Sequence, residues 1–404
     1  AGPITRPRRP SPARGARHSP EAPVTRPRRQ TPARGAARGA HAMVHIPDTA
    51  GETSGGVLVI GGMKRIRMDA QRAFPFVLGA DKTDVLNDVL LYDIDANTWD
   101  SLSGVTMAAK RAFPQAGLMS DGTVSITGGG GWPDEADDLY RQIELFDPLG
   151  AEGPGFVATF SFEGAATRSG HTMTSLGDDE SGQSQYLLWG GTSDISHSAE
   201  VLRQSSLQRE GVDGYVAPVA EGGNEAPFST YFHQLTPLSD SLEGDRRFLL
   251  TGGVTASGEG LSLPGLSLPR EEEAWVLTYA AGPSPTLTVI RAPGFGVGRI
   301  FHTAASSDGQ HLSVVGGFTS VTCGVDCTGY ELPAVGGIRL YDDATGAWSE
   351  APESDAFTAR GGMGGQMMSS GRVLTVGGEP DLWQFSAPSQ AMVELYTPSN
   401  TPTP

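Results

Sequence analysis

The sequence predicts an all-β fold, and three observations support this class. A short apolar run that ends in two glycines occurs six times, at 57–62, 124–129, 186–191, 248–253, 312–317 and 373–378. The first glycines stand at 61, 128, 190, 252, 316 and 377, so one regular period covers nearly all of the 404 residues. Continuous apolar runs and period-2 alternation dominate, and no convincing helical period of 3.6 residues occurs. Such a repeat indicates one repeat domain.

Each period contains four short β-type runs that are separated by turns rich in glycine, aspartate and asparagine. A strand-like run follows each glycine pair, at 89–92, 143–146, 199–202, 274–277, 338–341 and 392–396. Four runs in each of six units predict a six-bladed β-propeller of four-stranded blades, whose radial arrangement leaves few sheet edges open. A stacked β-solenoid is the alternative, but solenoid repeats are usually shorter.

The glycine pairs are expected to be structural. They would lie where neighbouring blades crowd together and a Cβ atom would clash. The pairs are Gly61 and Gly62, Gly128 and Gly129, Gly190 and Gly191, Gly252 and Gly253, Gly316 and Gly317, and Gly377 and Gly378.

The units resemble the Kelch-repeat β-propeller family in three features. These are the six glycine pairs, an upstream Arg-x-x-[His/Pro/Met] in five units, and a downstream Tyr followed by Trp in two units. The arginines are Arg38, Arg111, Arg168, Arg299 and Arg360, the remaining unit has Thr230, and the aromatic pairs are Tyr92/Trp99 and Tyr341/Trp348. The resemblance covers about 38–397 and implies a six-bladed propeller. The third and fourth units depart from it, with long loops and no downstream Trp.

The chain divides into an extended Pro/Arg-rich N-terminal arm at 1–37, the propeller at 38–397 and a Pro/Thr tail at 398–404. The last unit has only three strands before the tail, so we expect 22–30 of the arm to close the sixth blade. An outermost strand tolerates proline there, because it needs donors on one side only. Kelch-like propellers often close by pairing the two termini in this way.

The arm has a charge opposite to that of the propeller body. Residues 1–43 hold ten Arg and one Glu, a net charge of +9, and the rest of the chain holds 19 basic and 45 acidic residues, a net charge of −26. A 20-residue repeat places the same residues twice in the arm, so we expect one copy to dock on a neighbouring acidic propeller. The assembly residues would be Ile4, Thr5, Arg6, Arg8, Arg9, Arg14, Val24, Thr25, Arg26, Arg28 and Arg29. A neutral duplication that forms a solvated tail is the alternative.

The only cysteines, Cys323 and Cys327, are spaced C-x3-C. Two ligands cannot build a four-ligand zinc site, so we expect a local disulfide and an oxidising compartment. The chain begins without Met and without a leader, as a mature or partial chain would, and no apolar run is long enough for a transmembrane helix.

Chemistry near the axis has two sets of candidates. Arg111, Arg168, Arg299 and Arg360 are channel candidates for acid–base work of the kind that the resemblance to sialic-acid mutarotases implies, although arginine at this position more often binds loop carbonyls. His41, His171, His233 and His302 recur in four units and could converge on a metal, although packing beside the glycine pairs is the favoured interpretation. Residues 93–97 resemble the start of a calcium loop but lack its later ligands, so a turn is favoured.

These patterns lead to a functional hypothesis. We expect a secreted or surface-exposed, non-enzymatic binding and assembly module without a cofactor, which self-associates through its arm, with a filament as one form of the assembly. The alternatives are a carbohydrate-acting Kelch-like enzyme of the sialic-acid mutarotase type and a monomeric adhesin. Kelch-like copper-radical oxidases need a Cys–Tyr crosslink and further ligands, which two cysteines in one loop do not suit. The acidic body disfavours nucleic acid, whereas variable loops on a rigid ring favour a protein or glycan ligand.

Overall fold

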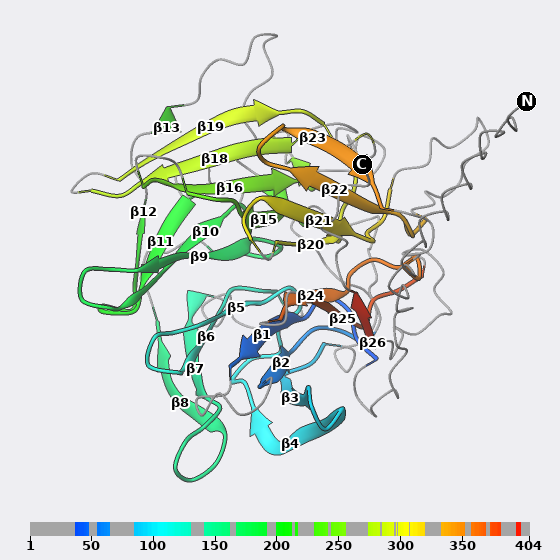
Figure 1. Ribbon diagram of the computed structural model, residues 1–404. Helices are drawn as coiled ribbons and strands as arrows, with labels where there is room; N and C mark the ends of the chain where they lie inside the picture. Colours follow the sequence, from blue (N-terminus) through cyan, green and yellow to red (C-terminus); the bar gives the residue numbers. More distant parts are fainter. Residues whose placement is uncertain are drawn as a thin grey trace, which may run out of the picture.

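The computed structural model is a six-bladed β-propeller, which confirms the predicted fold class (Figure 1). The structure describes residues 37–47, 55–64, 85–130, 141–161, 167–191, 199–211, 215–216, 230–240, 244–255, 274–282, 285–294, 296, 298–306, 308–319, 333–351, 357–368, 372–380 and 393–396. The described part contains no helix with the length and apolarity of a membrane span. The boundaries predicted for the arm, the propeller and the tail stay predictions.

The first three blades are four-stranded antiparallel sheets whose strands follow chain order from the axis outwards. Blade 1 comprises β1 (Ala42–Ile46), β2 (Gly56–Ile60), β3 (Asp88–Asp93) and β4 (Thr98–Thr106). Blade 2 comprises β5 (Gln115–Leu118), β6 (Val124–Thr127), β7 (Ile143–Asp147) and β8 (Gly155–Phe160). Blade 3 comprises β9 (Thr172–Asp178), β10 (Ser184–Trp189), β11 (Ala199–Arg203) and β12 (Gln208–Gly211).

The other three blades keep the same order, with additions in blade 4. Blade 4 comprises β15 (Gln234–Pro237), β16 (Arg246–Thr251), β18 (Ala274–Ala280) and β19 (Thr286–Ala292), with β13 (Tyr215–Val216) pairing in parallel along β19. A two-stranded sheet, β14 (Thr230–Tyr231) with β17 (Val254–Thr255), lies beside it in the chain. Blade 5 comprises β20 (Thr303–Ser306), β21 (His311–Val315), β22 (Ile338–Asp342) and β23 (Ala347–Glu350). Blade 6 shows β24 (Gly364–Met367), β25 (Val373–Val376) and β26 (Val393–Tyr396).

The ring closes between its first and last blades. The innermost strands touch in cyclic order, β1 with β5, β5 with β9, β9 with β15, β15 with β20, β20 with β24, and β24 with β1. Figure 1 shows β24 beside β1, although more than 300 residues separate them in the chain. The outer strand that we expect from 22–30 lies outside the described residues.

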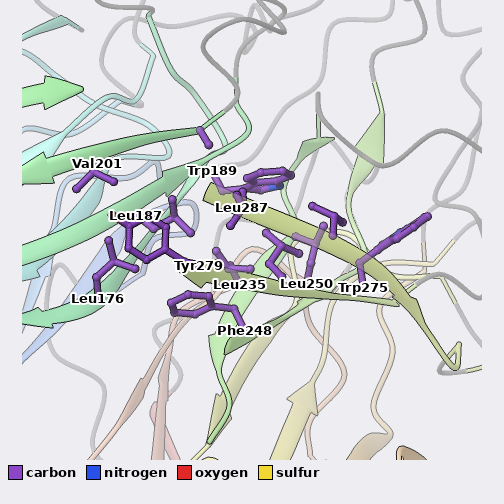
Figure 2. Close-up of a cluster of buried hydrophobic side chains, with 13 residues drawn as sticks. Leu176, Leu187, Trp189, Val201, Leu235, Phe248, Leu250, Trp275, Tyr279 and Leu287 are labelled. Carbon is purple, nitrogen blue, oxygen red and sulfur yellow. The ribbon is translucent and has the colours of Figure 1, made fainter. Parts of the chain in front are cut away.

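The hydrophobic core is divided among the gaps between blades. Successive side chains of a strand point to opposite faces, so Leu58 and Ile60 of β2 pack against blade 2, whereas Val57 and Val59 pack against blade 6. The middle strands are therefore buried on both faces, which explains their continuous apolar runs. Figure 2 shows the cluster between blades 3 and 4, to which blade 3 contributes Trp189 and Leu187 and blade 4 contributes Phe248. A separate cluster lies around the axis.

The glycine pairs join each blade to the next through the backbone. The N–H group of the second glycine donates to the carbonyl oxygen of Arg111, Arg168, Thr230, Arg299, Arg360 or Arg38 in the following blade, at 2.7–3.0 Å. A methyl group on the first glycine would lie at most 2.7 Å from the same carbonyl oxygen. Both glycines also have positive φ. A side chain at the first position would therefore block the hydrogen bond of its neighbour.

We predict that Gly252→Ala lowers the free energy of unfolding by at least about 2 kcal/mol. Alanine is unfavourable in the left-handed backbone conformation of this position, and its methyl group would clash with the carbonyl oxygen of Arg299. Urea denaturation of the purified protein measures this change. Gly282→Ala is the matched control, since no atom lies within 4 Å of a methyl group there. An equal effect of the two substitutions would contradict this explanation of the glycine pairs.

Candidate functional site

Buried arginines begin the innermost strands, and in most blades a carboxylate neutralises them. Arg111 donates from Nε and Nη2 to Glu144 Oε1, at 3.1 and 2.9 Å, and from Nη1 to the carbonyl oxygen of Gly128 at 2.7 Å. Arg168 pairs in the same way with Glu200 at 2.8 Å, and Arg360 with Glu394 at 2.6 Å. These side chains are at most 4% exposed. They link the first and third strands of their own blades.

The first and fifth blades vary this arrangement. Arg38 pairs with Asp88, which is partly exposed and lies at the start of β3. Arg299 donates from Nη1 to the carbonyl oxygens of Gly316 and Gly337, at 3.0 and 2.9 Å, and no described carboxylate lies within ion-pair distance of it. None of the four arginines that we considered for channel chemistry lines the axial cavity described below.

The four recurring histidines form wedges between blades. The Cβ atom of His233 packs against Gly253 of its own blade, and its imidazole ring packs against Gly190 of the preceding blade. His41, His171 and His302 repeat this placement at their own glycine pairs. Among the described residues, no group of three or more His, Cys, Asp or Glu side chains is arranged to hold a metal ion. The favoured interpretation, packing beside the glycine pairs, describes their position.

Burial keeps three of these imidazoles neutral. Burial, together with the charge of nearby arginines, lowers the pKa of His41, His233 and His302 to about 3. His233 Nε2 shares a hydrogen bond with Thr172 Oγ1 at 3.1 Å, and His302 Nε2 shares one with Thr251 Oγ1 at 2.9 Å. Both interactions cross from one blade to the next.

The stretch at 93–97 forms a strand-connecting turn. Asp93 Oδ1 accepts hydrogen bonds from the backbone N–H groups of Asp95 and Ala96, and Tyr92 donates from its hydroxyl to Asn97 Oδ1. Asp342 caps the equivalent turn of blade 5 in the same way. In both turns the aspartate side chain therefore accepts hydrogen bonds from backbone N–H groups of the turn.

A ring of strained residues surrounds the propeller axis. The third residue of each Arg-x-x-[His/Pro/Met] stretch, or of its Thr230 equivalent, has positive φ in all six blades, and these residues are Ala40, Phe113, Gly170, Phe232, Phe301 and Gly362. Backbone hydrogen bonds join them from blade to blade, for example from Phe113 N–H to the Ala40 carbonyl at 2.7 Å and from Ala40 N–H to the Gly362 carbonyl at 2.7 Å. The three phenylalanine rings cluster with centroids 4.1–5.3 Å apart. They fill the centre of the ring.

The axial cavity beside this cluster is small. Its volume is about 60 Å³, and its lining includes the phenylalanine cluster, the four histidines, Gln115 and Gln234. A space of this size holds only a few water molecules. The cavity is too small for a sugar or for a long side chain of a bound peptide.

A larger groove lies at the other end of the strands, among the turns that join the first and second strands of blades 3, 4 and 5. Its volume is about 450 Å³, within the range of about 300–1,000 Å³ that is usual for small-ligand sites. Its lining includes Ser175, Ser239, Asp240, Arg246 and Asp308. The groove therefore presents hydroxyl groups, carboxylates and a guanidinium group together.

Contacts between blades hold the walls of this groove in place. Arg246 forms an ion pair with Asp240, and a methyl group on Gly177 of blade 3 would lie 2.6 Å from its Nη2 atom. Ser239 donates from its backbone N–H to the carbonyl of Gly309 at 2.8 Å and accepts from Gln310 Nε2 at 2.6 Å. Blades 4 and 5 are thus joined directly at the groove.

A histidine–aspartate pair lies beside the groove in blade 5. His311 Nδ1 is 2.7 Å from Asp308 Oδ2, and the two side chains are 43% and 38% exposed. Burial raises the pKa of Asp308, but hydrogen bonds from the side chain and backbone of His311 and from the backbone of Gln310 outweigh it and lower the pKa overall. Asp308 is ionised at neutral pH. Sequence reasoning missed this pair, since an Asp-Gly turn occurs in many propeller units and only its combination with His311 distinguishes it.

Several predicted features lie outside the described residues. These are the assembly residues of the arm and the two cysteines. The disulfide and the oxidising compartment that we expect from it therefore stay predictions.

The propeller resembles a solved fungal enzyme in its fold. No protein-family model and no curated protein matches the chain. Among solved structures, a fungal alcohol oxidase of the AA5 family, solved in complex with copper, matches with a TM-score of 0.56 and 13% sequence identity. The match covers 93% of this chain and 77% of that chain. At this identity the likeness shows the fold alone.

The described residues do not supply a copper site. They contain no cluster of three or more His, Cys, Asp or Glu side chains that could hold a metal ion, and the axial histidines are held between glycine pairs of adjacent blades. The cavity that they line has little room beyond a few water molecules. The resemblance to the oxidase therefore does not extend to a copper centre in the part of the chain that the structure describes.

The comparison corrects the expectation of a non-enzymatic module. The solved structure that the propeller resembles is an enzyme. The functional hypothesis of a non-enzymatic, self-associating module is therefore wrong as the leading interpretation. The arm through which the module would self-associate lies outside the described residues.

We predict that Glu144→Gln destabilises the protein by about 3 kcal/mol, because it leaves the guanidinium of Arg111 buried without a carboxylate. Glu350→Gln is the matched control, since Glu350 is 71% exposed in its pair with Arg339 and its loss is expected to change stability by less than about 1 kcal/mol. Urea denaturation compares the two variants. Similar small effects of both would show that the buried pair adds little.

We also predict that stability falls as the pH falls below about 6.5, and that His41→Met weakens this dependence. A histidine whose folded pKa is about 3 takes up its proton on unfolding between pH 3 and pH 6.5, so acid favours the unfolded state by up to about 1.4 kcal/mol per pH unit. Methionine is compatible with this position, because Met363 occupies it in blade 6. Unfolding free energies measured from pH 7 to pH 4 test the slope, and an unchanged slope would contradict the buried neutral state of His41.

Proposed function

We propose that the protein is a carbohydrate-acting propeller enzyme that uses acid–base chemistry, with its substrate bound in the groove of blades 3, 4 and 5. The groove itself carries this proposal, since it combines the volume of a small-ligand site with hydroxyl groups and charges of both signs. Sugars are recognised by such groups, because each hydroxyl of a sugar both donates and accepts a hydrogen bond.

The pair of His311 and Asp308 suits a proton-transfer step. The ionised carboxylate of Asp308 accepts the Nδ1 proton of a neutral His311, which leaves Nε2 as the proton acceptor. In anomer interconversion, His311 would take the proton of the anomeric hydroxyl while the bond from the anomeric carbon to the ring oxygen breaks. The ring oxygen would gain a proton from water, and closure on the other face of the carbonyl would return both protons. No electrons are transferred, so the step needs no metal.

The ion pair of Arg246 and Asp240 suits substrate binding. Both side chains line the groove and are more than 40% exposed, so their outer atoms can meet a sugar hydroxyl. The guanidinium group of Arg246 also lies close to Gly177 of blade 3. We assign these two residues to binding, His311 to proton transfer and Asp308 to the orientation of His311.

The resemblance to Kelch propellers belongs to the same proposal. It rests on the glycine pairs and the buried arginines, whose contacts repeat around the ring. It supports a shared blade architecture and leaves the substrate open.

We predict that the protein accelerates the anomer exchange of at least one free sugar and that His311→Gln lowers the rate by about 100-fold or more, the usual contribution of a general base. NMR exchange spectroscopy with glucose, N-acetylmannosamine and N-acetylneuraminate measures the rate. Asp308→Asn should also lower the rate, because it removes the carboxylate that holds His311 Nδ1. His45→Gln on β1 is the matched control and should keep the wild-type rate.

Either of two results would overturn this proposal. One is a wild-type rate that equals the buffer rate for all three sugars, and the other is a His311→Gln rate that equals the wild-type rate. Circular dichroism of each variant verifies that a lost rate does not come from unfolding.

A further inference from the structure

The pairing of arginine with a carboxylate has a fixed place in the propeller. In blades 2, 3 and 6 the carboxylate comes from the second residue of the third strand, Glu144, Glu200 or Glu394. Each of these residues pairs in register with the residue two before the first glycine. Blade 4 lacks both partners, with Thr230 in place of the arginine and Trp275 in place of the glutamate.

Blade 5 keeps the arginine and reverses the charge of its partner. Arg339 is the second residue of β22 and pairs in register with Val314, two residues before Gly316. It therefore occupies the position that glutamate holds in three other blades. Its own ion pair runs outwards to Glu350, at 2.9 Å on the neighbouring strand. A second arginine, itself paired with the exposed Glu350, thus stands where three other blades place the carboxylate that pairs with the buried arginine.

Arg299 remains buried in this setting, at 1% exposure. Its Nη1 atom donates hydrogen bonds to two carbonyl oxygens, and its Nε atom, like that of Arg360, has no hydrogen-bond partner among the described residues. Burial and the charge of Arg339 lower its pKa to about 10, although the charge of Glu350 acts in the opposite direction, and the guanidinium stays charged at neutral pH. A buried charge is costly when no carboxylate is close enough to pair with it directly.

The space beside Arg299 opens towards solvent. Gly337, whose carbonyl accepts from Arg299, is exposed. A methyl group on Gly337 would meet no atom closer than Arg299 Nη2, at 4.0 Å. Arg339 is itself partly exposed, at 23%. An anion that enters past Gly337 can therefore reach both guanidinium groups.

We propose that Arg299 and Arg339 form a binding site for a carboxylate, which takes the place of the glutamate that blades 2, 3 and 6 carry in the chain. A planar carboxylate matches the fork of a guanidinium group, as the bonds of Arg38 to the two oxygens of Asp88 illustrate. The site lies at the opposite end of the blade 5 strands from the groove, so it does not depend on the proposed enzymatic function. The ligand can be a small organic acid or the acidic group of a larger molecule.

Thermal unfolding in sodium acetate tests this site, with sodium chloride at equal ionic strength and uncharged acetamide as the matched solutes. Acetate should raise the melting temperature of the wild-type protein by about 2 °C or more as the site fills, and acetamide should not. Arg299→Thr should abolish the acetate effect. This substitution suits the fold, because blade 4 carries Thr230 at the equivalent position.

Arg339→Glu gives a second, opposite test that does not rely on loss of a side chain. It places a carboxylate where the other blades have one, so the variant should melt at a higher temperature than the wild type in chloride and should no longer respond to acetate. Lys64→Glu, an exposed change of the same charge, is the control and should keep the acetate response. A wild type that does not respond to acetate, or an Arg339→Glu variant that responds as the wild type does, would overturn the proposal.

Discussion

The fold depends on one backbone hydrogen bond that is repeated six times, from the second glycine of each pair to the carbonyl of the residue that begins the next blade. This bond brings the backbones of adjacent blades too close for a side chain at the first glycine. The buried arginine then binds the carbonyl of that first glycine in its own blade, as Arg111 does with Gly128. Backbone and side chain thus connect the end of the second strand to two blades at once.

This repeated contact leaves the ring rigid and lets single positions vary. The residue that follows the left-handed ring position is His41, Pro114, His171, His233, His302 or Met363. The four histidines and Met363 pack between two glycine pairs, whereas Pro114 lies at Gly129 and Met107 takes the place beside Gly61. The charge pairing varies in the same way, with Glu144 neutralising Arg111 and Arg339 facing Arg299. Positions that break the repeat are therefore the ones where a ligand can replace a partner that the described residues do not supply.

The fold could be predicted from the sequence because its main constraint has a local signature. Only glycine permits the approach of the next blade, so the pairs Gly61–Gly62 and Gly252–Gly253 reveal the period directly. The groove could not be predicted, since Ser175, Asp240 and Asp308 come from three turns that only the closed ring brings together. The lack of a described carboxylate beside Arg299 could not be predicted either. Only the strand register shows that Arg339 occupies the position that Glu144 holds in blade 2.

Native-state hydrogen exchange at the second glycines tests the central constraint most directly. If the hydrogen bond between blades closes the ring, the amides of Gly62, Gly129, Gly191, Gly253, Gly317 and Gly378 should exchange only through global unfolding, with similar free energies. The amide of Gly122, which bonds to Met119 within a surface turn, should exchange much faster. Exchange of the second glycines at the rate of Gly122 would contradict the account, since the blades would then separate without unfolding.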